Sequence, residues 1–200
     1  MMELLGGVLG LSFGSGLNAY ATVLGLGILH RLGVAHLPPS LEVVGSTPVM
    51  VTAALLYIIE FVADKIPFVD SVWDAIHTVI RPAAGAVLGY GIVGNVDPQW
   101  RVIAALFGGG IALTAHTAKA STRAAVNMSP EPFSNWFLSL GEDALSFFLV
   151  WLTGSHPLIA LALGLILAAT AIYIVWKLST FARRVFRRAT TADRMRRNAG

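Results

Sequence analysis

Long apolar stretches recur along this chain, and each comes close to the length needed to cross a lipid bilayer. A transmembrane helix needs about 20 mostly apolar residues, and six segments meet or approach that length. They lie near residues 4–32, 46–64, 71–94, 101–123, 134–153 and 156–178. Only 12% of the residues are charged, against about 25% in soluble domains. The sequence therefore predicts an all-α polytopic membrane helix bundle of about six segments, some of them broken or re-entrant.

Positive charge is concentrated at the C-terminus. Residues 176–200 contain Lys177 and seven arginines, directly after the last apolar segment. Basic residues beside a membrane helix mark its cytoplasmic side. We predict one transmembrane domain, 1–179, and a basic cytoplasmic tail, 180–200, that contacts anionic lipid headgroups. No aromatic platform for stacking bases accompanies the arginines, so we do not expect a nucleic-acid partner.

The count of six segments also predicts a topology. With six spans, the N-terminus lies on the same side as the tail, so both termini are expected in the cytoplasm of a cell with the protein in its inner membrane. The N-terminus lacks a basic region before its apolar stretch, so we predict a retained helix rather than a cleaved signal peptide. The chain has no cysteine, which excludes disulfides and cysteine-based metal sites.

Two short stretches suggest an internal repeat. Residues 13–22 read FGSGLNAYAT and residues 107–116 read FGGGIALTAH. Each lies in the first span of a three-span block, which predicts two inverted repeats, about 4–94 and 100–178. Chance similarity in glycine-rich sequence is the alternative.

Glycines at every fourth position favour close helix packing. This spacing occurs at Gly6, Gly10 and Gly14 and again at Gly85 and Gly89. The same faces offer a surface for a homo-oligomer. An alternative is that FGSG and FGGG mark breaks in a helix, with half-helix ends pointing at a central site.

Ionisable residues form a stripe on the third segment. Asp70, Asp74, His77 and Arg81 fall within roughly 60° of one another on a helix. A charged residue at mid-membrane costs about 2.5–3.5 kcal/mol on insertion scales, so the stripe must face other helices or water. Such residues in a membrane segment are a functional hypothesis, with a structural salt-bridge network as the alternative.

The neighbouring segments supply further ionisable and polar residues. Acids end the second segment and interrupt the fifth, and a basic stripe follows one face of the fourth. The simplest arrangement pairs this basic stripe with the acids, and snorkelling of its lysine and arginine to headgroups is the alternative. A buried amide in the first segment is expected to make packing hydrogen bonds or to serve as a ligand group. These residues are Glu60 and Asp64, Glu142 and Asp143, His116, Lys119 and Arg123, and Asn18.

The stripe also contains residue types that can bind a metal ion. Two carboxylates and an imidazole on one face suit a first-row divalent ion, but Arg81 in the same stripe argues against a cation-binding site. We therefore expect no metal, no cofactor and no enzymatic activity.

Three strings resemble a known bacterial integral-membrane family, domain of unknown function 4126. They are GLNAYATVLGLG, FVADKIPFVDSVWDAIHTVIRPAAGA and TAHTAKASTR, and the resemblance covers roughly residues 10–175. It implies a multi-span membrane protein but no settled activity. It marks as signature positions Asp64, Lys65, Pro67, Asp70, Asp74, His77, Arg81 and Pro82.

Together these features predict a small membrane transporter or channel for an ion or small solute, with proton coupling at Asp74 and His77 and a homo-oligomer as the working form. The predicted coupling site contains Glu60, Asp64, Asp70, Asp74, His77 and Arg81, with Asn18, His116, Lys119, Arg123, Glu142 and Asp143 as partners. One alternative is an anionic-lipid translocase or lipid-binding protein, in which the cationic side chains bind a phosphate headgroup; these are Lys65, Arg81, Lys119 and Arg123. The other alternative is a non-transporting membrane scaffold.

Overall fold

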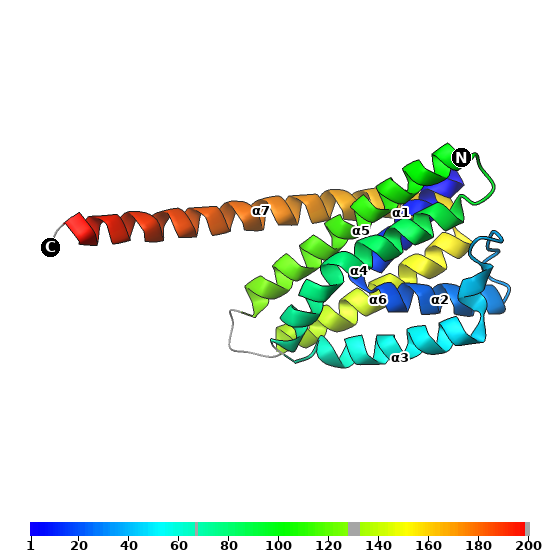
Figure 1. The fold of residues 1–200 in the computed structure, drawn as a ribbon, viewed down its shortest axis with the longest axis horizontal. Helices are drawn as coiled ribbons and strands as arrows, with labels where there is room; N and C mark the ends of the chain where they lie inside the picture. Colours follow the sequence, from blue (N-terminus) through cyan, green and yellow to red (C-terminus); the bar gives the residue numbers. More distant parts are fainter. Residues whose placement is uncertain (67, 128–132, 199–200) are drawn as a thin grey trace.

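The protein is described by a computed structural model that covers residues 1–66, 68–127 and 133–198, with side chains up to residue 184. Pro67 and the side chains of the arginines beyond Arg184 lie outside the described residues. Every described element is helical, which confirms the predicted all-α class (Figure 1). The helices are α1 (Met2–Leu17), α2 (Ala19–Arg31), η1 (Glu42–Gly45), α3 (Thr47–Ala63), α4 (Val69–Ile92), α5 (Pro98–Val126), α6 (Phe133–Ser155) and α7 (Pro157–Asn198).

Among the described residues, three helices are long and apolar enough to cross a membrane: α5, α6 and the Pro157–Arg184 part of α7. Helices α1 and α3 are apolar but shorter. Helix α4 has 24 residues, with apolar side chains on its outer face and charged ones inside the bundle. Val72 and Val79 are 63% and 75% exposed, whereas Arg81 is fully buried. Apolar side chains outside and charges inside are the distribution that lipid imposes on a helix bundle.

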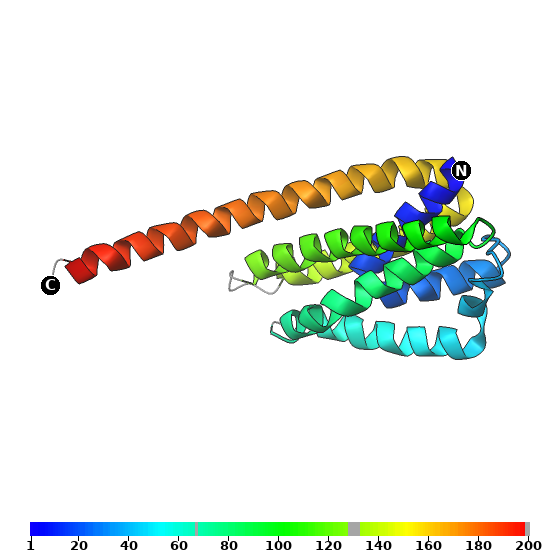
Figure 2. The same ribbon diagram turned by 45° about the horizontal axis from the view of Figure 1, so that its top comes forward.

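The first apolar segment is a helical hairpin and not a single span. The break is Asn18, whose backbone is extended (φ −150°, ψ 106°). Its side chain accepts a hydrogen bond from the Ala21 amide and so caps α2. Gly14 lies against Thr22 and Leu11 packs with Leu26, so α2 runs back alongside α1 (Figures 1 and 2). The expected single segment at 4–32 is therefore two helices that form a hairpin.

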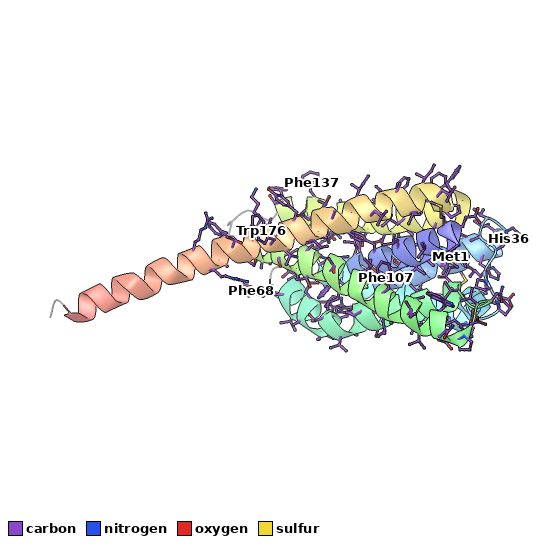
Figure 3. The ribbon with its side chains drawn as sticks, turned by 90° about the horizontal axis from the view of Figure 1, so that it is seen from above. Met1, His36, Phe68, Phe107, Phe137 and Trp176 are labelled. Atoms are coloured by element: carbon purple, nitrogen blue, oxygen red, sulfur yellow. The ribbon has the colours of Figure 1, made fainter. Side chains whose placement is uncertain are left out.

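The hairpin changes the path of the chain. Figure 3 shows Met1 and His36, before and after the hairpin, at one end of the bundle and Phe68 toward the other. Helices α3 to α7 then alternate in direction, and α7 ends far from the N-terminus (Figure 1). The described ends of the chain thus lie at opposite ends of the molecule. The expectation of both termini in the cytoplasm counted residues 4–32 as one membrane crossing, and the side on which each terminus lies stays a prediction.

The glycine spacing serves packing within the chain. A Cβ added at Gly85 would lie 2.5 Å from the Cβ of Ala112, and one added at Gly108 would lie 2.5 Å from the Gly85 carbonyl oxygen. Gly6 similarly lies against the Pro157 carbonyl. These contacts bring α4 against α5 and α1 against α7, so the glycine faces are used inside the bundle rather than offered to another copy. Helix α5 continues unbroken through the FGGG stretch.

Candidate functional site

The ionisable residues of the two halves meet in one buried cluster at the half of the bundle that holds the α3–α4 turn. Acids come from the end of α3, the start of α4 and from α6, and cations come from α4 and α5. All but one are at most 5% exposed, and the Glu142 side chain is 13% exposed. The buried members are Glu60, Asp64, Asp70, Asp74, His77, Arg81, His116, Lys119, Arg123 and Asp143.

Arg81 is the centre of one group of contacts. Its Nη2 donates to Glu60 Oε1 at 2.8 Å, and its Nη1 donates to Asp74 Oδ1 at 3.2 Å. The same Nη1 also donates to His116 Nδ1 at 2.7 Å. A fully buried guanidinium is tolerated only when carboxylates and hydrogen bonds replace its water, so Arg81 ties α3, α4 and α5 together.

Lys119 and Arg123 form the second group with Asp64 and Glu142. Asp64 Oδ2 accepts from Lys119 Nζ and from Arg123 Nη2, each at 2.9 Å. Glu142 Oε2 lies 3.3 Å from Lys119 Nζ and 2.5 Å from Arg123 Nη2. The basic stripe therefore pairs with an acid at the end of α3 and an acid of α6, and both cations are buried.

The tip of the α1–α2 hairpin reaches the cluster. Asn18 donates to Asp143 Oδ1 at 2.9 Å, so the buried amide both caps α2 and binds an acid. Lys119 Nζ donates to the Leu17 carbonyl, the free end of α1, at 3.0 Å. The Tyr20 hydroxyl lies 3.2 Å from His77 Nε2. A re-entrant segment is tolerated at membrane depth when its polar ends are buried in protein, and this cluster buries them.

Asp70 lies apart from the ion pairs. Its Oδ2 accepts from Asn127 at 2.8 Å and from Asn135 at 3.3 Å, and its Oδ1 accepts from the Ser71 amide. These bonds fasten the start of α4 to α5 and α6, which is a structural role. Asn127, Asn135, Tyr20 and the Leu17 carbonyl were not predicted. Asn127 had a signal, because it follows Arg123 by four residues and extends the basic stripe on the same face.

The two histidines differ in what their hydrogen bonds allow. His77 Nδ1 faces the Trp73 carbonyl at 2.7 Å and must carry a hydrogen, which leaves Nε2 to accept from Tyr20. His116 Nδ1 must accept from Arg81, so its hydrogen is on Nε2, facing Thr78 Oγ1 at 3.1 Å. These tautomers are assigned from the hydrogen-bond network. His116 is thereby held neutral, whereas His77 can take a second proton at Nε2, 3.8 Å from Glu60 Oε2.

Negative charge exceeds positive charge in the cluster. In the described structure six carboxylates, including Asp70 and Glu142, are matched by four cationic side chains even when the half-buried Lys65 is included. Three buried carboxylate oxygens have no hydrogen-bond partner there: Glu60 Oε2, Asp64 Oδ1 and Asp143 Oδ2. Unpaired buried carboxylates are costly, so the cluster favours protons or another cation.

The described residues contain no group of three or more histidines or carboxylates placed to hold a metal ion. Asp70 and His77, which the sequence put on one face with Asp74, are directed to asparagines and to a backbone carbonyl respectively.

A bundle of membrane-like helices around a buried ion-pair network defines the class of this protein. A family model described as "Domain of unknown function (DUF4126)" matches residues 5–177, and the chain belongs to this family. Neither a curated protein nor a solved structure matches the chain.

Proposed function

We propose that this protein is a small membrane transporter that couples the movement of an ion or small solute to protons through the buried cluster. One observation carries this proposal: the surplus of buried carboxylates over cations, with three carboxylate oxygens left unpartnered. A buried site in which carboxyl groups outnumber cations binds and releases positive charge, because each bound proton or cation removes an unpaired buried charge.

His77, Glu60 and Asp74 are the proton-exchanging groups in this proposal, and the two acids share Arg81. A proton on His77 Nε2 creates a donor that faces the unpartnered Glu60 Oε2, 3.8 Å away. The same proton turns Nε2 into a donor, so the Tyr20 hydroxyl on the hairpin must change from donor to acceptor or lose this contact. Proton binding thereby changes one link between the hairpin and α4, and we propose this change as the coupling to movement.

The proposed setting is the cell membrane, with the arginine-rich end of α7 in the cytoplasm. The charged cluster then lies in the cytoplasmic half, near Lys65. Arg31 and Arg101 lie at the opposite end, so the tail provides most of the positive-inside bias. The predicted inverted repeats, about 4–94 and 100–178, are not part of the proposal, because α1 and α5 both run from the end that holds Met1 and Trp100 toward the cluster. The break at Asn18 also has no counterpart in α5.

The anionic-lipid alternative depends on free cationic donors. Arg81 Nε has no hydrogen-bond partner in the described structure, which favours that alternative. The carboxylates around Lys119 and Arg123 favour cation binding over anion binding. Thermal stabilisation by anionic lipids that is lost in both Arg81→Ala and Arg123→Ala would support the lipid alternative.

The test is proton flux in liposomes that contain the full chain and a trapped pH-sensitive dye. Sodium, potassium or ammonium gradients are imposed in turn, and the wild-type protein is expected to move protons in response to at least one. Asp74→Asn and His77→Ala should slow this flux at least about tenfold, as removal of a proton-transfer group does. The matched controls are Asp97→Asn and His36→Ala, whose side chains are exposed. Equal rates in wild type and both cluster variants would refute proton coupling.

A further inference from the structure

The ammonium group of Lys119 lies in an all-oxygen environment at the break between α1 and α2. Its Nζ is 2.9 Å from Asp64 Oδ2, 3.0 Å from the Leu17 carbonyl oxygen and 3.3 Å from Glu142 Oε2. Glu60 Oε1 is next, at 3.8 Å. These oxygens come from α1, the end of α3, and α6, whereas the lysine comes from α5. The group is held by the bundle as a whole and not by its own helix.

Each of these oxygens attracts positive charge. Three belong to carboxylates, and the Leu17 carbonyl is at the C-terminal end of α1, where the helix dipole concentrates partial negative charge. Carbonyls at the end of a broken membrane helix are used to coordinate cations in transporters. Lys119 is only 3% exposed. Its ammonium group therefore fills the space among these oxygens that water or a free ion would otherwise fill.

We propose that Lys119 fills a binding site for a small monovalent cation, an alkali metal ion or ammonium, which takes the place of its ammonium group during transport. This inference rests on the proposed transport function and names its substrate class. The exchange conserves charge, since one positive charge leaves the carboxylates as another arrives. The oxygens surround Nζ at 2.9 to 3.3 Å, wider than the 2.3–2.6 Å shell of calcium, which favours a large monovalent ion.

A cavity leads toward this site. It has a volume of about 570 Å³ and opens between α5 and α6. Leu17 and Glu142 line it, and both also contribute oxygens to the Lys119 environment. The exposed Phe137 of α6, labelled in Figure 3, is also part of its lining. Glu142 is the one charged residue in this lining and the cluster acid with the most exposed side chain, at 13%.

The first test uses the native chain, which has only three lysines, Lys65, Lys119 and Lys177. The purified protein is acetylated at fixed ionic strength in sodium, potassium or tetramethylammonium chloride, and each lysine is quantified by mass spectrometry. Displacement predicts severalfold faster acetylation of Lys119 in potassium than in tetramethylammonium, which is too large for the site. Lys65 and Lys177 serve as internal references and should not change. Equal Lys119 rates in all three salts would overturn the proposal.

The second test removes the tethered cation. Lys119→Ala should lose thermal stability, and ammonium or potassium at about ten times its dissociation constant should raise its melting temperature by about 3–5 °C relative to tetramethylammonium. Lys65→Ala is the matched control, because its ammonium contacts the Phe61 carbonyl and Ser139 instead of carboxylates. No cation-specific rise, or an equal rise in the control, contradicts the proposal. If Lys119→Ala does not fold, the acetylation result decides.

The two proposals fail separately. Absence of cation effects at Lys119, with proton flux still lost in Asp74→Asn, would remove the cation site and leave proton coupling in place. Cation effects at Lys119 with unchanged flux in the Asp74 and His77 variants would support the site and refute the proton mechanism.

Discussion

The two halves of α4 are held in the bundle by opposite means. Before Pro82 the helix presents charged groups, and Arg81 alone contacts Glu60, Asp74 and His116. After Pro82 the face toward α5 is made of small residues, and Gly85 and Gly89 let α5 approach its backbone. Lipid gives little hydrophobic drive to bring helices together. The comparison shows one helix using ion pairs at one end and close backbone contact at the other.

The largest effect is expected for Arg81→Ala, in the charged half. The change leaves Glu60 and Asp74 buried without their shared partner, and removal of one member of a buried ion pair costs about 3–5 kcal/mol. Thermal unfolding in detergent would show the loss. Adding Glu60→Gln should recover part of it, because the unpaired charge is then gone. A melting temperature equal to wild type would mean that these ion pairs contribute no net stability.

A smaller effect is expected for Gly85→Leu, in the glycine half. A Cβ at this position would already lie 2.5 Å from the Ala112 Cβ, and overpacking typically costs about 1–3 kcal/mol. Gly110→Leu is the matched control, since no atom lies within 4 Å of a Cβ there. The two variants are compared by thermal unfolding. Equal losses would show that the close contact between α4 and α5 is unimportant.

Asn18→Ala is expected to cost about 1–2 kcal/mol. It removes both the cap of α2 and the hydrogen bond to Asp143. Asn18→Asp separates the two roles, because aspartate can cap the helix but cannot donate to the Asp143 carboxylate. It should therefore be no more stable than the alanine variant in the same unfolding assay. Full recovery by aspartate would assign the whole effect to the cap.

The smallest effect is expected for Tyr20→Phe, at about 0.5–1.5 kcal/mol for one hydrogen bond. The hydroxyl contributes through His77 Nε2, so the effect should vanish when His77 is already alanine. A double-mutant cycle of melting temperatures measures this coupling. Additive losses would place the role of the Tyr20 hydroxyl elsewhere.

Much of the arrangement around the charged half of α4 was predicted from the sequence. The spacing of Asp70, Asp74, His77 and Arg81 predicted one buried face, and the cost of exposing charges to lipid predicted its partners on α3, α5 and α6. Segment 46–64 corresponds to α3 (Thr47–Ala63) and segment 71–94 to α4 (Val69–Ile92). The particular pairs were not predictable, because the cations and acids lie at similar depths and several pairings satisfy the same charges.

The hairpin of α1 and α2 was predicted only as an alternative, a helix break at the FGSG stretch of residues 13–16, which lies just before Asn18. Apolar, glycine-rich sequence continues on both sides of Asn18, and neither a proline nor a charged loop marks the turn. A single residue with extended backbone separates the two helices. What stabilises the turn comes from distant sequence, namely Lys119 and Asp143. Composition along the first segment therefore fits one span as well as a re-entrant pair.

That turn also imposes an order on biosynthesis. Asn18 and its partner Asp143 are separated by 125 residues, so at about 5–20 residues per second the ribosome supplies the acid about 6–25 s after the amide. The Leu17 carbonyl waits similarly for Lys119, 102 residues later. During that interval the polar tip of the hairpin has none of the partners that hold it in the finished protein. We therefore expect this hairpin to reach its final position in the bundle only after α5 and α6 have been made.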